Sequence, residues 1–437
     1  MTDAFERLEQ RLRSRVLSLK PPTVRVGVES WFPYYAGYSQ EFVVETLLAL
    51  GAKPGWNVLD PWNGAGTTTQ VADAIGCNAI GFDLNPVAAL VAAARLTRAA
   101  DAQHSAGLAE ELLSIATRTP TAVLTEDPLG EWLSPRLVRR YRSIEGAILD
   151  LLAARAGVRV SLNSVTPPPF AAFFLLCLVR AGKGLSRRKQ SSNPTWVTPA
   201  RRRDASASVL DKAFLQTVAQ CAYDSTTQSL PTQPARPTAS SVAIADARAI
   251  PLEGASIDAV VTSPPYCTRI DYFRATLFEL AALGIGASSS QYGDLRRAAM
   301  GTNLMRACEQ NSRSPHAEPV VDLLCRIAKH PSKASATYYS RSFQQYFTDA
   351  HQSLSELKRV LRPEATAVLV VQSSYYKDIP IPLGQLFEAM GENLGMKSQV
   401  VLSTRVRRVL ATINPRATFH LKNRQYTEDV VALQLTR

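Results

Sequence analysis

The sequence DPWNGAGTTT at residues 60–69 decides the fold class of this chain. It follows an apolar run at residues 56–59 of the kind that ends a buried strand, and its threonines begin a helical pattern. Residues 79–83 predict a second strand that ends in an acid, and an alanine-rich helix is expected from residue 85. Strand, glycine turn, helix, strand and acid in this order are typical of a doubly wound α/β fold.

This α/β pattern is interrupted in the middle of the chain and then resumes. The predicted units are an N-terminal helix at 1–29, a first part of the core at 30–100, a largely helical insertion at 101–240, and a second part of the core at 241–437 that contains a smaller insertion at 284–340. We expect the last two strands of the core, near 400–410 and 429–435, to be antiparallel.

Composition narrows the function classes. The chain has 437 residues, of which 46 % are hydrophobic and 20 % charged, and its formal charge of +12 favours a polyanionic partner such as nucleic acid. Its six cysteines lie far apart with no C-x-x-C, which argues against a zinc site or a disulfide scaffold. The longest apolar run, 169–179, is too short to cross a bilayer, and residues 1–20 resemble a charged amphipathic helix and not a signal peptide. We therefore expect a cytoplasmic protein without a metal.

The glycine turn predicts a site for a small ligand. Gly64 and Gly66 allow close backbone approach and positive φ, and the helix that follows offers free N–H groups. A phosphate-binding loop would carry a lysine beside its last Ser/Thr, and the tail at 67–69 has none, so ATP is not expected. Asp83 is placed to accept from ribose hydroxyls, although a helix cap or a solvated acid is an alternative. Asp246, after the next strand, could accept from an adenine amino group.

A second motif, Thr-Ser-Pro-Pro-Tyr at 262–266, follows the apolar residues 259–261. The Ser263 hydroxyl and the Pro264 carbonyl can accept the two N–H bonds of an exocyclic amino group, which favours a pyramidal nitrogen with an exposed lone pair. Two consecutive prolines restrict the backbone and so fix these acceptors. Tyr266 could stack on a flat base. The turn therefore predicts chemistry on an amino group.

Together the two motifs resemble those of the DNA amino-methyltransferases that use S-adenosylmethionine, and the Ser-Pro-Pro-Tyr spelling is most similar to the N4-cytosine branch. The segment WFPYYAGY at 31–38 is similar to the part of that family that flanks the methionine end of the cofactor, and KRVLRP at 358–363 is similar to its later core. The resemblance implies a seven-stranded Rossmann-like methyltransferase core with S-adenosylmethionine as cofactor. It also implies methylation of cytosine N4 in double-stranded DNA, in restriction–modification or phage defence, with a cognate restriction endonuclease as a partner.

The resemblance also implies residue roles. The residues expected to be catalytic are Ser263, Pro264, Pro265 and Tyr266. The residues expected to bind the cofactor are Phe32, Tyr34, Asp60, Pro61, Asn63, Gly64, Gly66, Thr67, Thr68, Asp83, Asn85, Asp246 and Thr262. An enzyme of this kind must take its target base out of the duplex, and it needs no covalent intermediate. Cys267 is therefore interpreted as a small packing residue.

A basic tract lies within the large insertion. Residues 180–203 hold eight Lys/Arg and no Asp/Glu. Such a tract often belongs to a solvated loop, but an interleaved tryptophan and a phosphate-rich substrate favour DNA contact. The residues predicted to contact DNA are Arg187, Arg188, Lys189, Trp196, Arg201, Arg202 and Arg203. A second cluster is formed by Arg405, Arg407 and Arg408, and Tyr375 and Tyr376 could line the base pocket or pack in the core.

Three other functions stay open on the sequence alone. The same fold could methylate adenine N6, or it could methylate an amino group in RNA. A DNA-binding module that kept the fold without activity is the third, although intact Gly64, Gly66 and Ser263 speak against it.

Overall fold

The computed structural model of the chain describes residues 3–14, 19, 27–32, 37–119, 126–153, 162–186, 188–190, 197–200, 205–226, 238–267, 271–302, 304, 306, 316–406 and 424–435. Within these ranges no helix combines the length and the apolar character that a membrane span requires. The same residues contain no group of three or more His, Cys, Asp or Glu side chains suited to a metal ion.

A seven-stranded sheet forms the core, with strand order β10-β11-β7-β6-β1-β2-β5. Its strands are β1 (Asn57–Asp60), β2 (Asn78–Asp83), β5 (Ser241–Ile244), β6 (Ile257–Thr262), β7 (Leu361–Gln372), β10 (Lys397–Val406) and β11 (Tyr426–Gln434). The five strands from β7 to β5 run parallel, whereas β11 is antiparallel to both β7 and β10. The predicted α/β class and the antiparallel pairing of the last two strands are confirmed.

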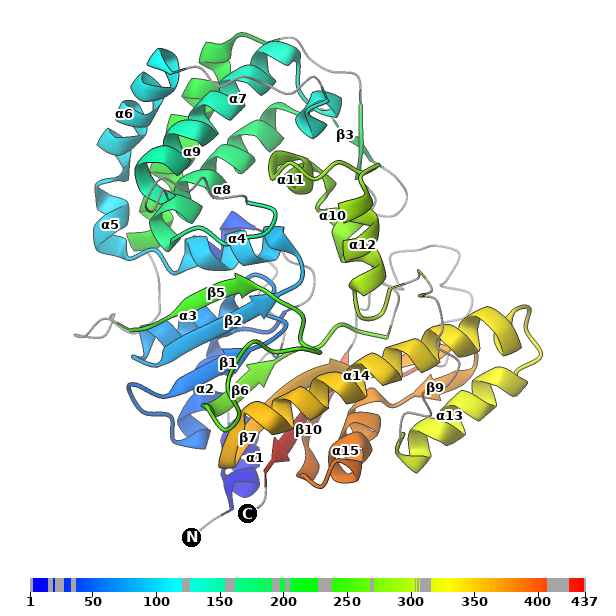
Figure 1. Ribbon diagram of the computed structural model, residues 1–437. Helices are drawn as coiled ribbons and strands as arrows, with labels where there is room; N and C mark the ends of the chain where they lie inside the picture. Colours follow the sequence, from blue (N-terminus) through cyan, green and yellow to red (C-terminus); the bar gives the residue numbers. More distant parts are fainter. Residues whose placement is uncertain are drawn as a thin grey trace.

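Helices cover both faces of this sheet (Figure 1). One face packs on α14 (Ser340–Val360) and α15 (Leu383–Asn393), and the other packs on α1 (Ala4–Ser14), α2 (Gln40–Leu50) and α3 (Thr67–Ala74). Neighbouring residues of a strand point to opposite faces of the sheet. Leu59 and Val260 therefore pack on the side of α14 and α15, whereas Val58 and Ala259 pack on the side of α1, α2 and α3. Burial on both faces explains why these strands appear in the sequence as continuous apolar runs.

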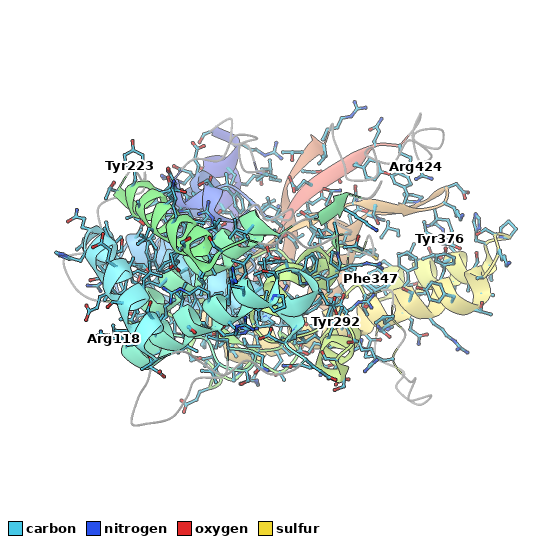
Figure 2. The ribbon with its side chains drawn as sticks, turned by 90° about the horizontal axis from the view of Figure 1, so that it is seen from above. Arg118, Tyr223, Tyr292, Phe347, Tyr376 and Arg424 are labelled. Atoms are coloured by element: carbon cyan, nitrogen blue, oxygen red, sulfur yellow. The ribbon has the colours of Figure 1, made fainter. Side chains whose placement is uncertain are left out.

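The residues predicted to form the large insertion belong to a helical layer built on α4 (Pro86–Arg95). It contains α5 (Ala99–Gln103), α6 (Ser105–Arg118), η2 (Pro128–Glu131), α7 (Pro135–Ile148), η3 (Leu149–Ala153), α8 (Pro169–Leu185) and α9 (Ala207–Thr226). The apolar run at 169–179 is the buried helix α8 at the centre of this layer. Seen from above, Arg118 and Tyr223 lie on the outer side of the layer, opposite Tyr376 and Arg424 (Figure 2).

Part of the basic tract is regular structure and not an open loop. Helix α8 continues to Leu185, and β3 (Arg188–Gln190) then pairs with β4 (Val197–Pro199) as two antiparallel strands. Lys189, which lies opposite Thr198 in this pair, is exposed. No strand was predicted there, because three-residue strands are too short to show a period.

Of the remaining elements, η1 precedes the first core strand and the others follow β6 in the chain. They are η1 (Gly27–Trp31), α10 (Tyr272–Ala275), α11 (Leu277–Ala282), α12 (Ser290–Ala298), α13 (Glu318–Lys329), η4 (Ser335–Tyr339), and the hairpin of β8 (Ser374–Tyr376) with β9 (Ile379–Ile381). Helix α14 begins at Ser340.

Gly66 requires a different explanation from the predicted one. Its φ is +80°, as expected for the turn, but a Cβ added there would lie 2.7 Å from the Cβ of Ala92 on α4. The absence of a side chain therefore allows α4 to pack closely on the turn. Gly66 does not line the cavity described below, so its contact with a ligand stays a prediction.

We predict that Gly66→Ala destabilises the chain more than Gly51→Ala does. Both glycines have φ near +80° and so share a cost of about 1–2 kcal/mol for a left-handed alanine. A Cβ on Gly51 meets open space, whereas a Cβ on Gly66 overpacks the α3–α4 contact by about 1–3 kcal/mol more. Urea unfolding of the two variants measures the difference, and equal losses would contradict this account.

Candidate active site

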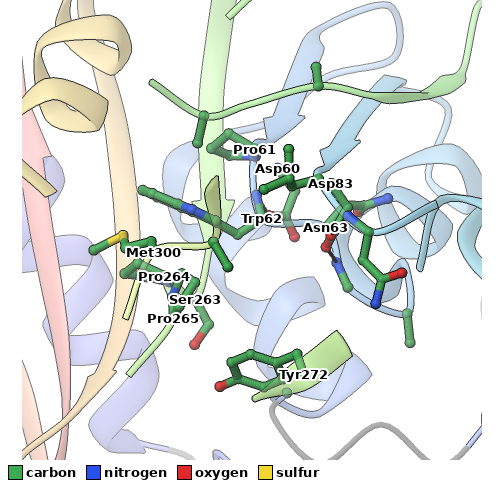
Figure 3. A pocket seen from close by; sticks show the side chains of 18 of the residues that line it. Asp60, Pro61, Trp62, Asn63, Asp83, Ser263, Pro264, Pro265, Tyr272 and Met300 are labelled. Carbon is green, nitrogen blue, oxygen red and sulfur yellow. Dashed lines mark hydrogen bonds between the residues drawn. The ribbon is translucent and has the colours of Figure 1, made fainter. Parts of the chain in front are cut away.

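One cavity opens at the carboxyl ends of β1, β2, β5 and β6 (Figure 3). After β1 the chain continues to β2 and β5 on one side of the sheet, and after β6 it continues to β7 on the other side. The strand order therefore reverses between β1 and β6. Ligands bind at such a switch point in open α/β folds, and the cavity lies there. The predicted residues that line it are Asp60, Pro61, Asn63, Gly64, Thr67, Asp83, Asn85, Asp246, Ser263, Pro264 and Pro265. The two sequence motifs therefore meet in one cavity.

Asp83 ties the glycine turn to the end of β2. Its carboxylate accepts the N–H groups of Gly64 and Asn85, each at 2.8 Å. Burial raises the pKa of Asp83 to about 6, and these two hydrogen bonds oppose the rise. Gly64 holds a φ of +49°, which suits a glycine at this bend. The glycine turn is therefore held in place by Asp83, which also lines the cavity.

Asp60 links the two motifs. It is 1 % exposed, and it accepts the hydroxyl of Thr262 at 2.5 Å, the hydroxyl of Tyr38 at 3.0 Å and the N–H of Trp62 at 3.1 Å. Burial raises the pKa of this carboxyl group to about 6, and the hydrogen bonds, that of Thr262 first, oppose the rise. Thr68 joins the network through its hydroxyl, which donates to the Val261 carbonyl at 2.9 Å.

This network gives two threonines a structural role. Thr68 and Thr262 were predicted to bind the cofactor, but both are fully buried and neither lines the cavity. Their hydroxyls are used within the protein to hold the end of β1 against the end of β6. Hydrophobicity and motif spelling do not distinguish a hydroxyl that contacts a ligand from one that holds a neighbouring strand.

Ser263 lines the cavity, and its hydroxyl hydrogen is engaged in a hydrogen bond within the protein. The hydroxyl donates to the Val370 carbonyl on β7 at 2.8 Å, so its oxygen is left to act as an acceptor. The Pro265 carbonyl accepts the Tyr346 hydroxyl at 2.9 Å, which fixes the other side of the turn. The turn therefore presents two acceptors on a rigid backbone.

The aromatic residues that line the cavity are Tyr38, Trp62, Tyr272 and Phe273, whereas Tyr266 does not line it. Tyr266 is 9 % exposed, does not line the cavity, and has its hydroxyl 3.5 Å from Glu428. Tyr272, at the start of α10, lines the cavity beside Ser263 and Pro265 (Figure 3). No local sequence signal marked Tyr272, because its position depends on how the chain folds back after the turn.

Asp246 lines the cavity, and an arginine that the sequence did not indicate fixes its position. Arg248 approaches it to 2.5 Å and also contacts Asp349 and the Ala298 carbonyl, each at 2.8 Å. The Asp246 side chain is 32 % exposed, so a ligand can still reach its oxygens. Arg306 shares Asp349 with Arg248, which extends the charged network away from the cavity.

Several predicted residues lie elsewhere. Phe32 is 8 % exposed and packs in the core of the helical layer, outside the cavity lining. Tyr375 and Tyr376 lie on β8, and Tyr376 is buried among His330, Tyr339 and Phe343. The residues Tyr34, Arg187, Trp196, Arg201, Arg202, Arg203, Arg407 and Arg408 lie outside the described residues, as does the side chain of Arg188. Burial raises the pKa of the Cys267 thiol, in keeping with a packing residue.

Comparison with known proteins gives distant relatives of one class. No protein-family model matches the chain. It is 22 % identical over 422 residues to the type II methyltransferase M.BsoBI of Geobacillus stearothermophilus, a match that covers 85 % of this chain and 79 % of that protein. It is 20 % identical over 426 residues to the type II methyltransferase M.AvaI of Nostoc sp. strain PCC 7120 and to M.AvaI of Anabaena variabilis, with 91 % of this chain and 84 % of each protein covered. The chain is thus a distant relative of type II methyltransferases over most of its length.

We predict that Thr262→Val lowers the free energy of unfolding by about 1–3 kcal/mol, because a buried carboxyl group loses its shortest hydrogen bond. Thr46→Val is the matched control. Thr46 is also fully buried, but its hydroxyl has no partner among the described residues, so its removal should be neutral or stabilising. Chemical unfolding compares the two variants, and equal effects would show that the Asp60 contact adds no stability.

Proposed function

We propose that this chain is a DNA methyltransferase of restriction–modification that transfers a methyl group from S-adenosylmethionine to cytosine N4 in double-stranded DNA. One observation supports the proposal above the others: the glycine turn and the acceptors of Ser263 and Pro264 line the same cavity. The distant similarity to type II methyltransferases supports the same class.

The residues around the cavity fit the proposed cofactor. The carboxylates of Asp83 and Asp246 follow adjacent parallel strands, β2 and β5, where a ribose and an adenine amino group would require acceptors. The main chain near Gly64 and the start of α3 provide the wall next to them. When bound, S-adenosylmethionine supplies a methyl group on a positively charged sulfur.

The Ser-Pro-Pro turn would activate the amino group by position. Its nitrogen is a weak nucleophile because the lone pair is delocalised into the ring. Ser263 Oγ and the Pro264 carbonyl would accept its two N–H bonds and leave the lone pair directed at the methyl group. The hydrogen bond from Ser263 to Val370 favours this role, since the hydroxyl then acts as an acceptor.

The proposed binding of DNA is supported by the positive charge of the chain. The chain carries a formal charge of +12, and the exposed Lys189 lies on the short β3–β4 pair within the basic tract. Lys and Arg side chains that contact phosphates provide most of the sequence-independent affinity for DNA. The flat ring of Tyr272, next to Ser263, offers a wall for a base taken out of the duplex.

Mass spectrometry of nucleosides tests the proposal. DNA is incubated with the protein and labelled S-adenosylmethionine, digested and analysed, with RNA as a parallel substrate. We expect labelled N4-methylcytosine from DNA. N6-methyladenine would contradict the cytosine assignment, label in RNA alone would contradict the DNA substrate, and no labelled nucleoside would contradict the enzymatic function.

We predict that Ser263→Ala lowers kcat about 10²–10³-fold with little change in the Kd for S-adenosylhomocysteine, because it removes one preorganised hydrogen-bond partner of the reacting group. Ser14→Ala, at an exposed serine on α1, is the control and should retain full activity. Turnover and calorimetric binding are measured on the same preparations. Unchanged turnover in Ser263→Ala would refute the role of that hydroxyl.

The Asp83 carboxyl group predicts a pH dependence of cofactor binding. Its pKa is raised to about 6, and only the ionised form accepts from both ribose hydroxyls. Affinity for S-adenosylhomocysteine should therefore rise from pH 5 to pH 7, by up to about tenfold per unit below the pKa, and then level off. Asp83→Asn should bind more weakly and lose this rise. Calorimetry across this pH range provides the data, with Asp101→Asn as the control, and a rise that survives in Asp83→Asn would exclude this carboxyl as its source.

A further inference from the structure

Two opposite charges lie at the glycine-turn end of the cavity, and neither belongs to a sequence motif. Arg95, the last residue of α4, is 4 % exposed and lines the cavity. Its guanidinium donates to the Ala65 carbonyl in the turn at 2.7 Å and to the Glu29 carbonyl at 3.3 Å. Glu29 lines the cavity as well.

The helical insertion sets the position of Glu29. This residue belongs to η1 (Gly27–Trp31), and the Trp31 indole N–H donates to Asp224 on α9 at 3.1 Å. The Trp31 ring also contacts the Phe173 ring of α8 edge-on, with centroids 5.6 Å apart. Glu29 is thus held by the insertion, and Arg95 by the glycine turn.

The strand order separates this end of the cavity from the nucleoside end. Ala65 follows β1, Asp83 ends β2, and Asp246 follows β5, which is the next strand beyond β2. Neighbouring strands lie about 4.8 Å apart, so Asp246 is about 10 Å from the strand that precedes the glycine turn. Arg248, the other arginine of the lining, already contacts two carboxylates and a carbonyl beside Asp246. An arginine and a glutamate therefore mark the opposite end.

We propose that Arg95 and Glu29 bind the zwitterionic amino-acid end of S-adenosylmethionine, with the Arg95 guanidinium on its carboxylate and the Glu29 carboxylate on its ammonium group. The inference rests on the cofactor of the proposed function. A guanidinium matches the two oxygens of a carboxylate, and paired opposite charges distinguish a zwitterion from a plain nucleoside. The pair would therefore set selectivity for the amino-acid end and leave recognition of the nucleoside to Asp83 and Asp246.

Calorimetry with three ligands tests this inference on the full chain without DNA. S-adenosylhomocysteine carries both charged groups, its decarboxylated analogue keeps only the amine, and methylthioadenosine has neither. We expect the wild-type chain to bind the decarboxylated analogue about 10–100-fold more weakly than S-adenosylhomocysteine, the range of a charge-assisted hydrogen bond. In Arg95→Met that difference should disappear, and affinity for methylthioadenosine should stay at the wild-type value.

The variants separate binding from support of the turn. Arg95→Lys keeps the charge and should retain part of the discrimination, and Arg98→Met, at an exposed arginine three residues further on, should retain all of it. Equal weakening of all three ligands in Arg95→Met would show that Arg95 only supports the turn. Equal wild-type affinity for S-adenosylhomocysteine and its decarboxylated analogue would also overturn the inference. Absence of binding for all three ligands would instead overturn the cofactor assignment on which it rests.

Discussion

The buried carboxylate of Asp60 is the contact on which the site depends. It ends β1 and accepts the hydroxyl of Thr262, which ends β6, so two segments some two hundred residues apart in the chain are joined at one point. The Tyr38 hydroxyl adds a third segment. A carboxyl group at 1 % exposure is costly to keep, and its raised pKa reflects that cost. The hydrogen bonds offset it and hold the glycine-turn side of the cavity against the Ser-Pro-Pro turn.

The helical insertion supports one side of the cavity by packing, although none of its described residues lines the cavity. Its core continues into α4 and the glycine turn, since Ala65, Val87 and Leu90 pack in the same cluster as the helices α6 to α9. Asp224 of α9 reaches back to Trp31, which precedes the first core strand. The insertion, α4 and the glycine turn therefore form one packed unit, and a change in any of them would alter the position of η1.

Much of the frame could be predicted from local pattern. The helix at Thr67–Ala74, the acid that ends β2 and the antiparallel pair of last strands each follow from period, turn residues and capping. The contacts that complete the site could not. Tyr272, Arg248 and Arg95 enter the cavity through the tertiary fold, and nothing in their own neighbourhood in the sequence indicates where they point. At Gly66 the motif indicated the turn correctly, but the close packing of α4 on it became visible only in the fold.

The most direct test of the central claim, that one cavity brings a methyl donor and an amino group together, is a crystal structure of the chain with S-adenosylhomocysteine. The account predicts that the ligand lies across the carboxyl ends of β1, β2 and β5, with its ribose at Asp83 and its sulfur facing Ser263 and Pro264. A ligand bound elsewhere, or one whose sulfur points away from that turn, would contradict it.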